Sequence, residues 1–444
     1  MVEETRALMS ADEMSALSKK HTMFDWVPQD AVVPVPIEYA KGVYMYTPDG
    51  KRILDFNSQL MSVNIGHGDQ RVIDAITAQA QKVCYVHPYT ATEPRAELGR
   101  KLAELTPGDL DVWFFTNGGA EANENAIRIA RHYTGRQKIL ARNRSYHGAV
   151  GSTIVATGDP RRWGAEIGVS GIVRAPDFHK WGKADPEPVD VALRELEEVI
   201  MYEGPQNIAG FIMEPIVGTN GILIPPDGYM QGVRDICTQH GIMLIADEVM
   251  SGFGRTGEWF AVDIWGIEPD LMSIAKGLTS SYVQLGALGM SRKVADTWGD
   301  KPFPAGLTYN SHALACATGL AVIDVYEQDD LIARAKRMGE VMAGHHARLA
   351  QKHPSVGRTR NKGMFGIIEL VRSHDPYEPM APYNGTSDEM KAIGAHFKKH
   401  GLFTFLRFGM IHTNPPLTIT EEEMAEGFEI IDGALELADE AIRD

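Results

Sequence analysis

Short, almost continuous apolar runs alternate with amphipathic patterns through the middle of the chain. The apolar runs predict strands at residues 112–116, 138–142, 152–157, 208–216, 242–249 and 270–275, and the patterns between them predict helices at 120–133, 189–203 and 229–241. Strands that are apolar on both faces are typical of a sheet covered by helices on each side. The alternation therefore predicts an α/β fold built on a parallel or mostly parallel sheet.

The two ends of the chain follow other patterns. Residues 42–56 read as a hairpin that turns at Pro48-Asp49-Gly50. Residues 313–350 have the alanine-rich, amphipathic pattern of a long helix, and a closing helix is predicted to begin after Thr420, which can cap it. These patterns predict a smaller α+β unit beside the main sheet.

Composition excludes several classes of function. The 444 residues carry a formal net charge of −16, which argues against nucleic-acid binding because proteins that follow a phosphate backbone need a basic face. The three cysteines lie far apart and outside any CxxC pair, so neither a disulfide framework nor a metal site is expected. The chain shows no secretory leader and no apolar run of the ~20 residues that span a membrane, so the expected location is the cytoplasm.

A glycine motif at residues 252–257, GFGRTG, matches the GxGxxG fingerprint of dinucleotide-binding proteins. That fingerprint also requires a helix that begins at the glycines and faces the pyrophosphate. Here the glycines run into EWFAVDIWGIEPD, which has turn residues and little helical periodicity. An irregular glycine loop is the better interpretation, and a nicotinamide-dependent dehydrogenase is rejected.

Four kinds of chemically useful residue follow the ends of predicted strands. Lys276 follows LMSIA, and Asp247 stands near the end of IMLIADEV. TNGGA at residues 116–120 opens a helix, and SYHG at 145–148 supplies an aromatic side chain. A carbonyl cofactor that activates amines needs a lysine to form the imine, an acid beside its ring nitrogen, an anion cup for its phosphate and a flat packing partner.

Each candidate also has a simpler explanation when it is taken alone. Lys276 could be a solvated charge at a strand edge, Asp247 and Glu248 acids that merely end a strand, TNGGA a tight turn, and Tyr146 a packing aromatic. However, the carboxyl ends of parallel strands line one edge of a sheet. The ordered set would therefore meet at one site, which favours the cofactor interpretation.

The segment IADEVMSGFGRTGEWFAVDIWGIEPDLMSIAKGL, residues 245–278, resembles the signature of class III (ω-) aminotransferases, which are fold-type I enzymes dependent on pyridoxal 5′-phosphate. The resemblance extends from residue 42 to the C-terminal helix and includes the glycine motif. It implies a mostly parallel, seven-stranded sheet in a large cofactor-binding domain at 61–312 and a smaller α+β domain at 313–444. The N-terminal segment at 1–60 is expected to pack with the small domain.

The resemblance also implies a cofactor site. Lys276 would form the Schiff base and move the proton of the 1,3-transfer, and Asp247 would pair with the pyridine nitrogen. The other implied cofactor contacts are Gly118, Gly119, Ala120, Tyr146, His147, Glu214, Val249 and Thr308. Thr308 would reach the phosphate of the neighbouring subunit, which implies a homodimer with shared active sites, alone or paired into tetramers.

Four residues are implied to recognise the substrates. Arg407 resembles the mobile arginine that grips the acceptor's carboxylate in ω-transaminases, and Arg162 is a candidate contact for a sulfonate or carboxylate, or else a loop charge. Leu60 and Met61 lie in SQLMSVNIGHG, where many amine:pyruvate members carry tryptophan at the position of Met61. The departure at Met61 weakens the case for aryl amines.

The implied reaction transfers an amino group from an ω-amine or amino acid, such as taurine or β-alanine, to a 2-oxo acid by a ping-pong mechanism. Pyruvate is the favoured acceptor, and 2-oxoglutarate stays open. The alternatives are an aminomutase or racemase of the same family, and a cofactor-free binding protein on this fold.

Overall fold

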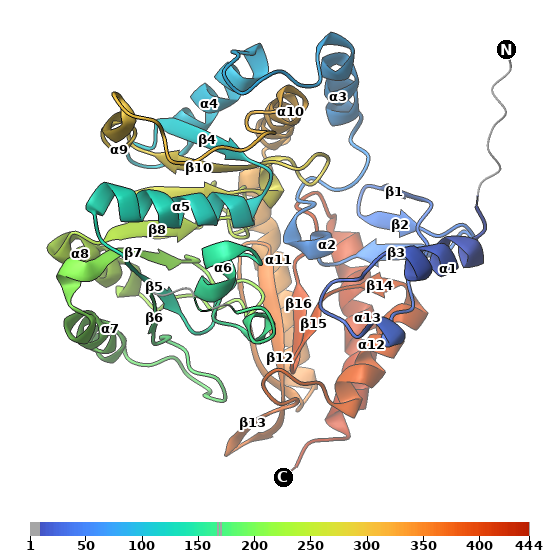
Figure 1. The fold of residues 1–444 in the computed structure, drawn as a ribbon. Helices are drawn as coiled ribbons and strands as arrows, with labels where there is room; N and C mark the ends of the chain where they lie inside the picture. Colours follow the sequence, from blue (N-terminus) through green and yellow to red (C-terminus); the bar gives the residue numbers. More distant parts are fainter. Residues whose placement is uncertain (1–8, 167, 169–170, 444) are drawn as a thin grey trace, which may run out of the picture.

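The structure is a computed structural model and describes residues 9–166, 168 and 171–443. Its central sheet has seven strands in the order β4-β10-β9-β8-β7-β5-β6 (Figure 1). These strands are β4 (Val112–Thr116), β5 (Lys138–Arg142), β6 (Ile172–Ala175), β7 (Ile208–Met213), β8 (Met243–Asp247), β9 (Leu271–Ile274) and β10 (Gly286–Met290). β10 is antiparallel to both of its neighbours, and the other pairings are parallel. The predicted α/β fold with a seven-stranded, mostly parallel sheet is confirmed.

Helices cover both faces of this sheet. On β8, Ile245 packs in one apolar cluster with α5 (Gly119–Thr134). Its neighbour Leu244 packs in another cluster, with α7 (Val189–Glu203) and α8 (Tyr229–His240). Successive side chains of a strand point to opposite faces, so the two clusters lie on opposite sides of the sheet. Burial on both sides is the reason that these strands read as continuous apolar runs.

The prediction of a strand at 152–157 is wrong. Most of these residues form the short helix α6 (Gly151–Ala156), and the edge strand β6 comes later in the chain. The carboxylate of Glu124 on α5 accepts hydrogen bonds from the backbone N–H groups of Ser152 (2.7 Å) and Thr153 (3.2 Å). A carboxylate at this position supplies the acceptors that the first turn of a helix lacks. The apolar pattern of the segment contains no sign of this contact.

Two smaller sheets accompany the C-terminal helices. One has the order β11-β12-β16-β15, with β13 paired to β12, and the other has the order β1-β2-β3-β14. Their strands are β1 (Tyr39–Lys41), β2 (Tyr44–Tyr46), β3 (Arg52–Asp55), β11 (Val356–Lys362), β12 (Phe365–His374), β13 (Tyr377–Pro379), β14 (Leu402–Phe403), β15 (Leu406–Arg407) and β16 (Met410–Thr413). β14 runs parallel to β3 with Leu402 opposite Leu54, so the N-terminal hairpin and the C-terminal part of the chain share a sheet. The domain boundaries at residues 60 and 312 stay predictions.

The remaining helices surround these sheets. They are α1 (Ala11–His21), α2 (Ser58–Met61), α3 (Gln70–Lys82), α4 (Glu93–Leu105), α9 (Arg292–Ala295), α10 (Ala313–Gln328), α11 (Leu331–Lys352), α12 (Asp388–His400) and α13 (Glu421–Asp439). The long helix predicted at 313–350 is two helices, which separate where Asp330 turns with a φ of +49°. α13 begins as predicted, with Thr420 and Glu423 in a reciprocal capping box. Across the part of the chain that the structure describes, no helix is long and apolar enough to cross a membrane.

Candidate active site

A cavity of about 300 Å³ opens at the carboxyl ends of β4, β5, β7, β8 and β9. Its walls include every cofactor-contact candidate except Thr308, namely Gly118, Gly119, Ala120, Tyr146, His147, Glu214, Asp247, Val249 and Lys276. Ligands of open α/β sheets bind at this edge. The structure therefore brings together, in the position where such a fold binds ligands, residues that lie up to 158 positions apart in the chain.

Lys276 leaves β9 into a short turn. Its φ is +45°, in the left-handed region that residues other than glycine rarely adopt. Burial lowers the pKa of its amine to about 8, although the carboxylates of Asp247 and Glu214 act in the opposite direction. A lysine with this pKa is substantially neutral at mildly alkaline pH, so its amine can act as a nucleophile or carry a proton.

Three hydrogen-bond donors hold the carboxylate of Asp247. Its Oδ2 accepts from Nδ2 of Asn123 and from Nδ1 of His147, both at 2.7 Å, and its Oδ1 accepts from the backbone N–H of Val249 at 3.1 Å. An ionised carboxylate only accepts, so Nδ1 of His147 carries the proton. The contacts fix the direction of the carboxylate. Sequence reasoning missed Asn123, whose only signal was its place in the second turn of the helix that follows TNGGA.

The start of α5 forms another wall of the cavity. Gly118 and Gly119 follow β4, and the free N–H groups at a helix start favour an anion. A Cβ on Gly119 would lie 2.7 Å from Cγ1 of Val249, whereas a Cβ on Gly118 would meet nothing within 4 Å. Glycine at position 119 is therefore what lets the helix start approach Val249 so closely.

Glu214 follows β7 and Tyr146 follows β5, so both lie across the sheet edge from the start of α5, which follows β4. The carboxylate of buried Glu214 accepts hydrogen bonds from the backbone N–H groups of Tyr146 (3.0 Å) and Gly218 (2.8 Å), and burial raises its pKa. The guanidinium carbon of Arg161 lies 3.7 Å from the centroid of the Tyr146 ring. A cation thus covers one face of an aromatic ring that also lines the cavity.

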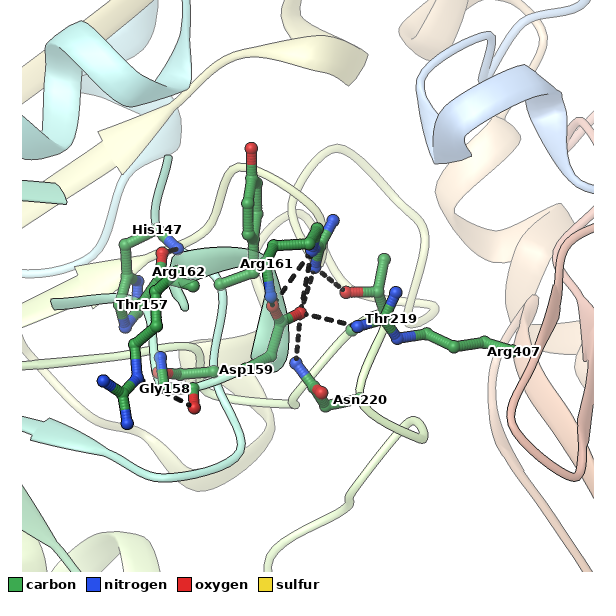
Figure 2. A network of polar contacts seen from close by, with 12 residues as sticks. His147, Thr157, Gly158, Asp159, Arg161, Arg162, Thr219, Asn220 and Arg407 are labelled. Carbon is green, nitrogen blue, oxygen red and sulfur yellow. Dashed lines mark hydrogen bonds and ion pairs between the residues drawn. The ribbon is translucent and has the colours of Figure 1, made fainter. Parts of the chain in front are cut away.

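Two adjacent arginines near the cavity point in different directions. Arg161 donates a hydrogen bond to Oγ1 of Thr219, a cavity residue, at 2.7 Å. Arg162 pairs with Glu166 and extends away from this network, as Figure 2 shows. The structure therefore brings Arg161 to the cavity, and it does not bring the predicted substrate contact Arg162 there. The local sequence DPRRW, residues 159–163, offers no means of distinguishing the two arginines.

The other predicted substrate contacts are divided between the core and the surface. Arg407 on β15 reaches Asp159, with 3.0 Å between its Nη2 and Oδ2 of the acid. Met61 is buried in an apolar cluster with Met250, which lines the cavity. Leu60 is 63% exposed. Of Leu60 and Met61, Met61 is thus the one that packs in the apolar cluster bordering the cavity.

Thr308 lies outside the cavity of its own chain. It is exposed, and its backbone carbonyl accepts a hydrogen bond from the hydroxyl of Tyr85 at 2.7 Å. Its expected contact with the phosphate of a neighbouring subunit stays a prediction.

The comparisons with a family model, with a relative and with two solved structures agree with one another. The family model "Aminotransferase class-III" matches residues 27–435. The omega-aminotransferase of Caulobacter vibrioides is 34% identical, over 90% of this chain and 92% of that protein. The solved taurine:2-oxoglutarate aminotransferase of Bifidobacterium kashiwanohense, in complex with PLP and glutamate, is 37% identical with a TM-score of 0.94, over 98% of this chain and 99% of that chain. An (S)-enantioselective omega-transaminase from Thermomicrobium roseum is 35% identical with a TM-score of 0.91, over 96% of this chain and 98% of that chain.

Proposed function

Since the chain belongs to the class-III aminotransferases, which use pyridoxal phosphate, we propose that it transfers an amino group from an ω-amine or amino acid to a 2-oxo acid by a ping-pong mechanism. One observation carries this proposal. A lysine whose pKa is lowered shares a single cavity with a firmly held carboxylate and the start of a helix.

The groups in the cavity match what pyridoxal phosphate requires. Lys276 offers an amine for covalent attachment, and Asp247 offers a carboxylate to the ring nitrogen. The backbone at Gly118, Gly119 and Ala120 offers an anion site to the phosphate. Val249 and Tyr146 would offer packing surfaces to the ring, His147 would support Asp247 from behind, and Glu214 would contact the cofactor as a further acid. The donor set therefore fits the cofactor.

When bound, pyridoxal phosphate supplies a carbonyl that captures the donor amine and a ring that takes up the electrons released at the carbon bearing it. Lys276 would hold the cofactor and then, once displaced, carry a proton at Nζ between the two ends of the transfer. Asp247 would keep a negative charge beside the ring nitrogen, and its three donors would prevent it from turning away. This rigidity reduces the reorganisation needed during the reaction.

Two arginines at the substrate end favour donors or acceptors that carry an acid group. Arg161 contacts Thr219 and Tyr146 in the cavity wall, and Arg407 reaches the same carboxylate as Arg161, that of Asp159 (Figure 2). Guanidinium groups bind carboxylates and sulfonates through paired hydrogen bonds. Taurine and β-alanine as donors and pyruvate as acceptor satisfy this requirement, and 2-oxoglutarate, which carries two carboxylates, would use both arginines. Met61 would shape the apolar part of the site.

A panel of donors measured with pyruvate and with 2-oxoglutarate tests the proposal. Taurine, β-alanine, 4-aminobutyrate and an aryl amine are the informative donors, and the amino acid formed from each acceptor is quantified. We expect one equivalent of acceptor consumed per donor, with acid-bearing donors preferred. Turnover of an amine without any acceptor would show an aminomutase or racemase and contradict the proposal.

We also propose that the chain acts as a cytoplasmic homodimer. Thr308 is exposed and adjoins Tyr85 and Tyr309, whose rings lie 6.0 Å apart with large exposed areas. An exposed aromatic surface of this kind suits burial against a second copy, and Thr308 beside it is free to contact that copy. The three cysteines of the chain are free, which suits the reducing cytoplasm. Light scattering during size-exclusion chromatography should give twice the mass of one chain, and a monomer active at the same specific rate would contradict the shared site.

A further inference from the structure

Asp159 is a fully buried carboxylate whose partner Arg161 contacts the cavity wall at Thr219. It precedes the short 3-10 helix Pro160–Arg162, and its side chain is 0% exposed. Oδ2 accepts hydrogen bonds from Nη2 of Arg161 at 2.5 Å, from Nη2 of Arg407 at 3.0 Å and from Nδ2 of Asn220 at 3.3 Å (Figure 2). One carboxylate therefore holds two guanidinium groups.

The two arginines come from different parts of the fold. Arg161 follows Asp159 in the chain, whereas Arg407 reaches across from β15 in the C-terminal sheet, as Figure 2 shows. Arg161 also contacts Thr219 and Tyr146 in the cavity wall. Nε of Arg407 is buried and has no hydrogen-bond partner among the described residues. Asp159 therefore connects β15 of the C-terminal sheet to the turn whose Arg161 contacts the cavity wall.

The charges in this network do not balance. Two guanidinium groups face one carboxylate, which leaves one net positive charge, and Arg407 has hydrogen-bonding capacity unused at Nε. Burial lowers the pKa of Arg407 to about 10, and Asp159 opposes this effect. A second anion could therefore pair with the excess positive charge of these three side chains. The acid group of a substrate has the charge and shape of the carboxylate that the arginines already bind.

We propose that Asp159 is an internal competitor for the acid group of the substrate. Between turnovers it holds Arg161 and Arg407 in place, and during binding the incoming carboxylate or sulfonate must take over part of its hydrogen bonds. Asp159 is thus a positioning residue that sets how tightly acid-bearing substrates bind. The inference rests on the proposed function, because it takes the two arginines as contacts for that acid group.

Asp159 also has a structural role that must be separated from its charge. Its Oδ1 accepts a hydrogen bond from the backbone N–H of Arg161 at 2.8 Å, which caps the short helix. Asparagine and serine can make the same capping bond without a negative charge. D159N and D159S therefore remove the competitor and keep the cap, and D159E keeps the charge.

Binding of unreactive acids to the cofactor-loaded enzyme tests the proposal without turnover. Propionate, ethanesulfonate and glutarate carry the acid groups but no amine or carbonyl, and their dissociation constants follow from calorimetry or from the visible absorbance of the bound cofactor. We expect D159N and D159S to bind them about tenfold more tightly than the wild type, most of all glutarate, which can occupy both arginines. D159E should bind them about as weakly as the wild type.

E166Q is the matched control. It removes the same unit of charge nearby, but Glu166 pairs with Arg162, which extends away from the network. We expect its dissociation constants to stay within about twofold of the wild type. Equal gains in E166Q and D159N would show a general charge effect and overturn the proposal.

Unchanged or weaker binding in D159N and D159S would overturn the proposal, and so would unfolding of both variants, which would make Asp159 purely structural. Unfolding of one variant leaves the other to decide. The proposed function fails in a different assay, the donor panel on the wild type. The two failures are therefore distinguishable.

Discussion

Gly119→Ala tests how closely the start of α5 must approach Val249. The added Cβ would lie 2.7 and 2.8 Å from the two methyl carbons of Val249. Carbon atoms in contact are about 3.5–4.0 Å apart, so Val249 or the helix start must move by about 0.8 Å. Both elements are proposed to hold the cofactor, Val249 at its ring and the helix start at its phosphate.

The loss of unfolding free energy in Gly119→Ala follows from this crowding against Val249. Overpacking of this kind costs about 1–3 kcal/mol, and the better helix propensity of alanine returns at most about 1 kcal/mol. We expect the apoprotein to lose about 1 kcal/mol of unfolding free energy, a fall of a few degrees or less in Tm for a chain of this size. The affinity for pyridoxal phosphate should fall about tenfold, because the ring contact and the phosphate contact are displaced relative to each other.

Gly118→Ala is the matched control. A Cβ there meets nothing within 4 Å, and its φ of 177° is extended backbone that any residue adopts. Thermal unfolding of the apoprotein and titration with pyridoxal phosphate are measured for both variants. Gly118→Ala should keep the Tm of the wild-type apoprotein. A Gly119→Ala protein with wild-type Tm and wild-type cofactor affinity would refute the reasoning, as would equal destabilisation by the two substitutions.

Four further outcomes are expected. Asp247→Asn should lower kcat/KM by about 100-fold or more with the cofactor still bound, because an amide cannot supply the charge beside the ring nitrogen; steady-state kinetics on cofactor-saturated enzyme checks this. Arg407→Gln should raise the KM for the 2-oxo acid by about 10- to 100-fold and leave a neutral amine donor nearly unaffected, which a two-substrate analysis separates. Arg162→Gln should change both constants less than about twofold, because its guanidinium pairs with Glu166 outside the cavity; a large rise in KM would restore it as a substrate contact. The rate at which apoprotein captures pyridoxal phosphate should rise with pH and level off above about 8, because only the neutral amine of Lys276 attacks and its pKa is lowered to about 8. Stopped-flow absorbance measures this rate. A rate that keeps rising up to the pH range of an ordinary lysine would contradict the lowered pKa of the buried amine.

The sequence was sufficient to predict five strands of the central sheet, β4, β5, β7, β8 and β9, and the residues at their carboxyl ends, whereas β6 and β10 were missed. Asp247 and Lys276 each stand at the end of an apolar run, and parallel strands bring such ends to one side. Their meeting in one cavity therefore depends on local patterns and on a general rule of topology. The same reasoning placed TNGGA and Tyr146 at that edge.

Features that depend on a contact between distant segments could not be predicted. The segment 152–157 is as apolar as a strand, but Glu124 on another helix caps it as α6. Arg161 and Arg162 are adjacent and chemically identical, and only the positions of Asp159 and Glu166 direct them apart.

The covalent link between cofactor and lysine is the most direct test of the central claim. Borohydride reduction of the cofactor-loaded enzyme, followed by peptide mass spectrometry, should find the reduced cofactor on Lys276. Lys276→Ala should show no such adduct, no yellow colour from a lysine-bound cofactor and no detectable transamination, while it keeps the thermal stability of a folded protein. An adduct on a different lysine, or a Lys276→Ala protein that remains yellow and active, would contradict the account.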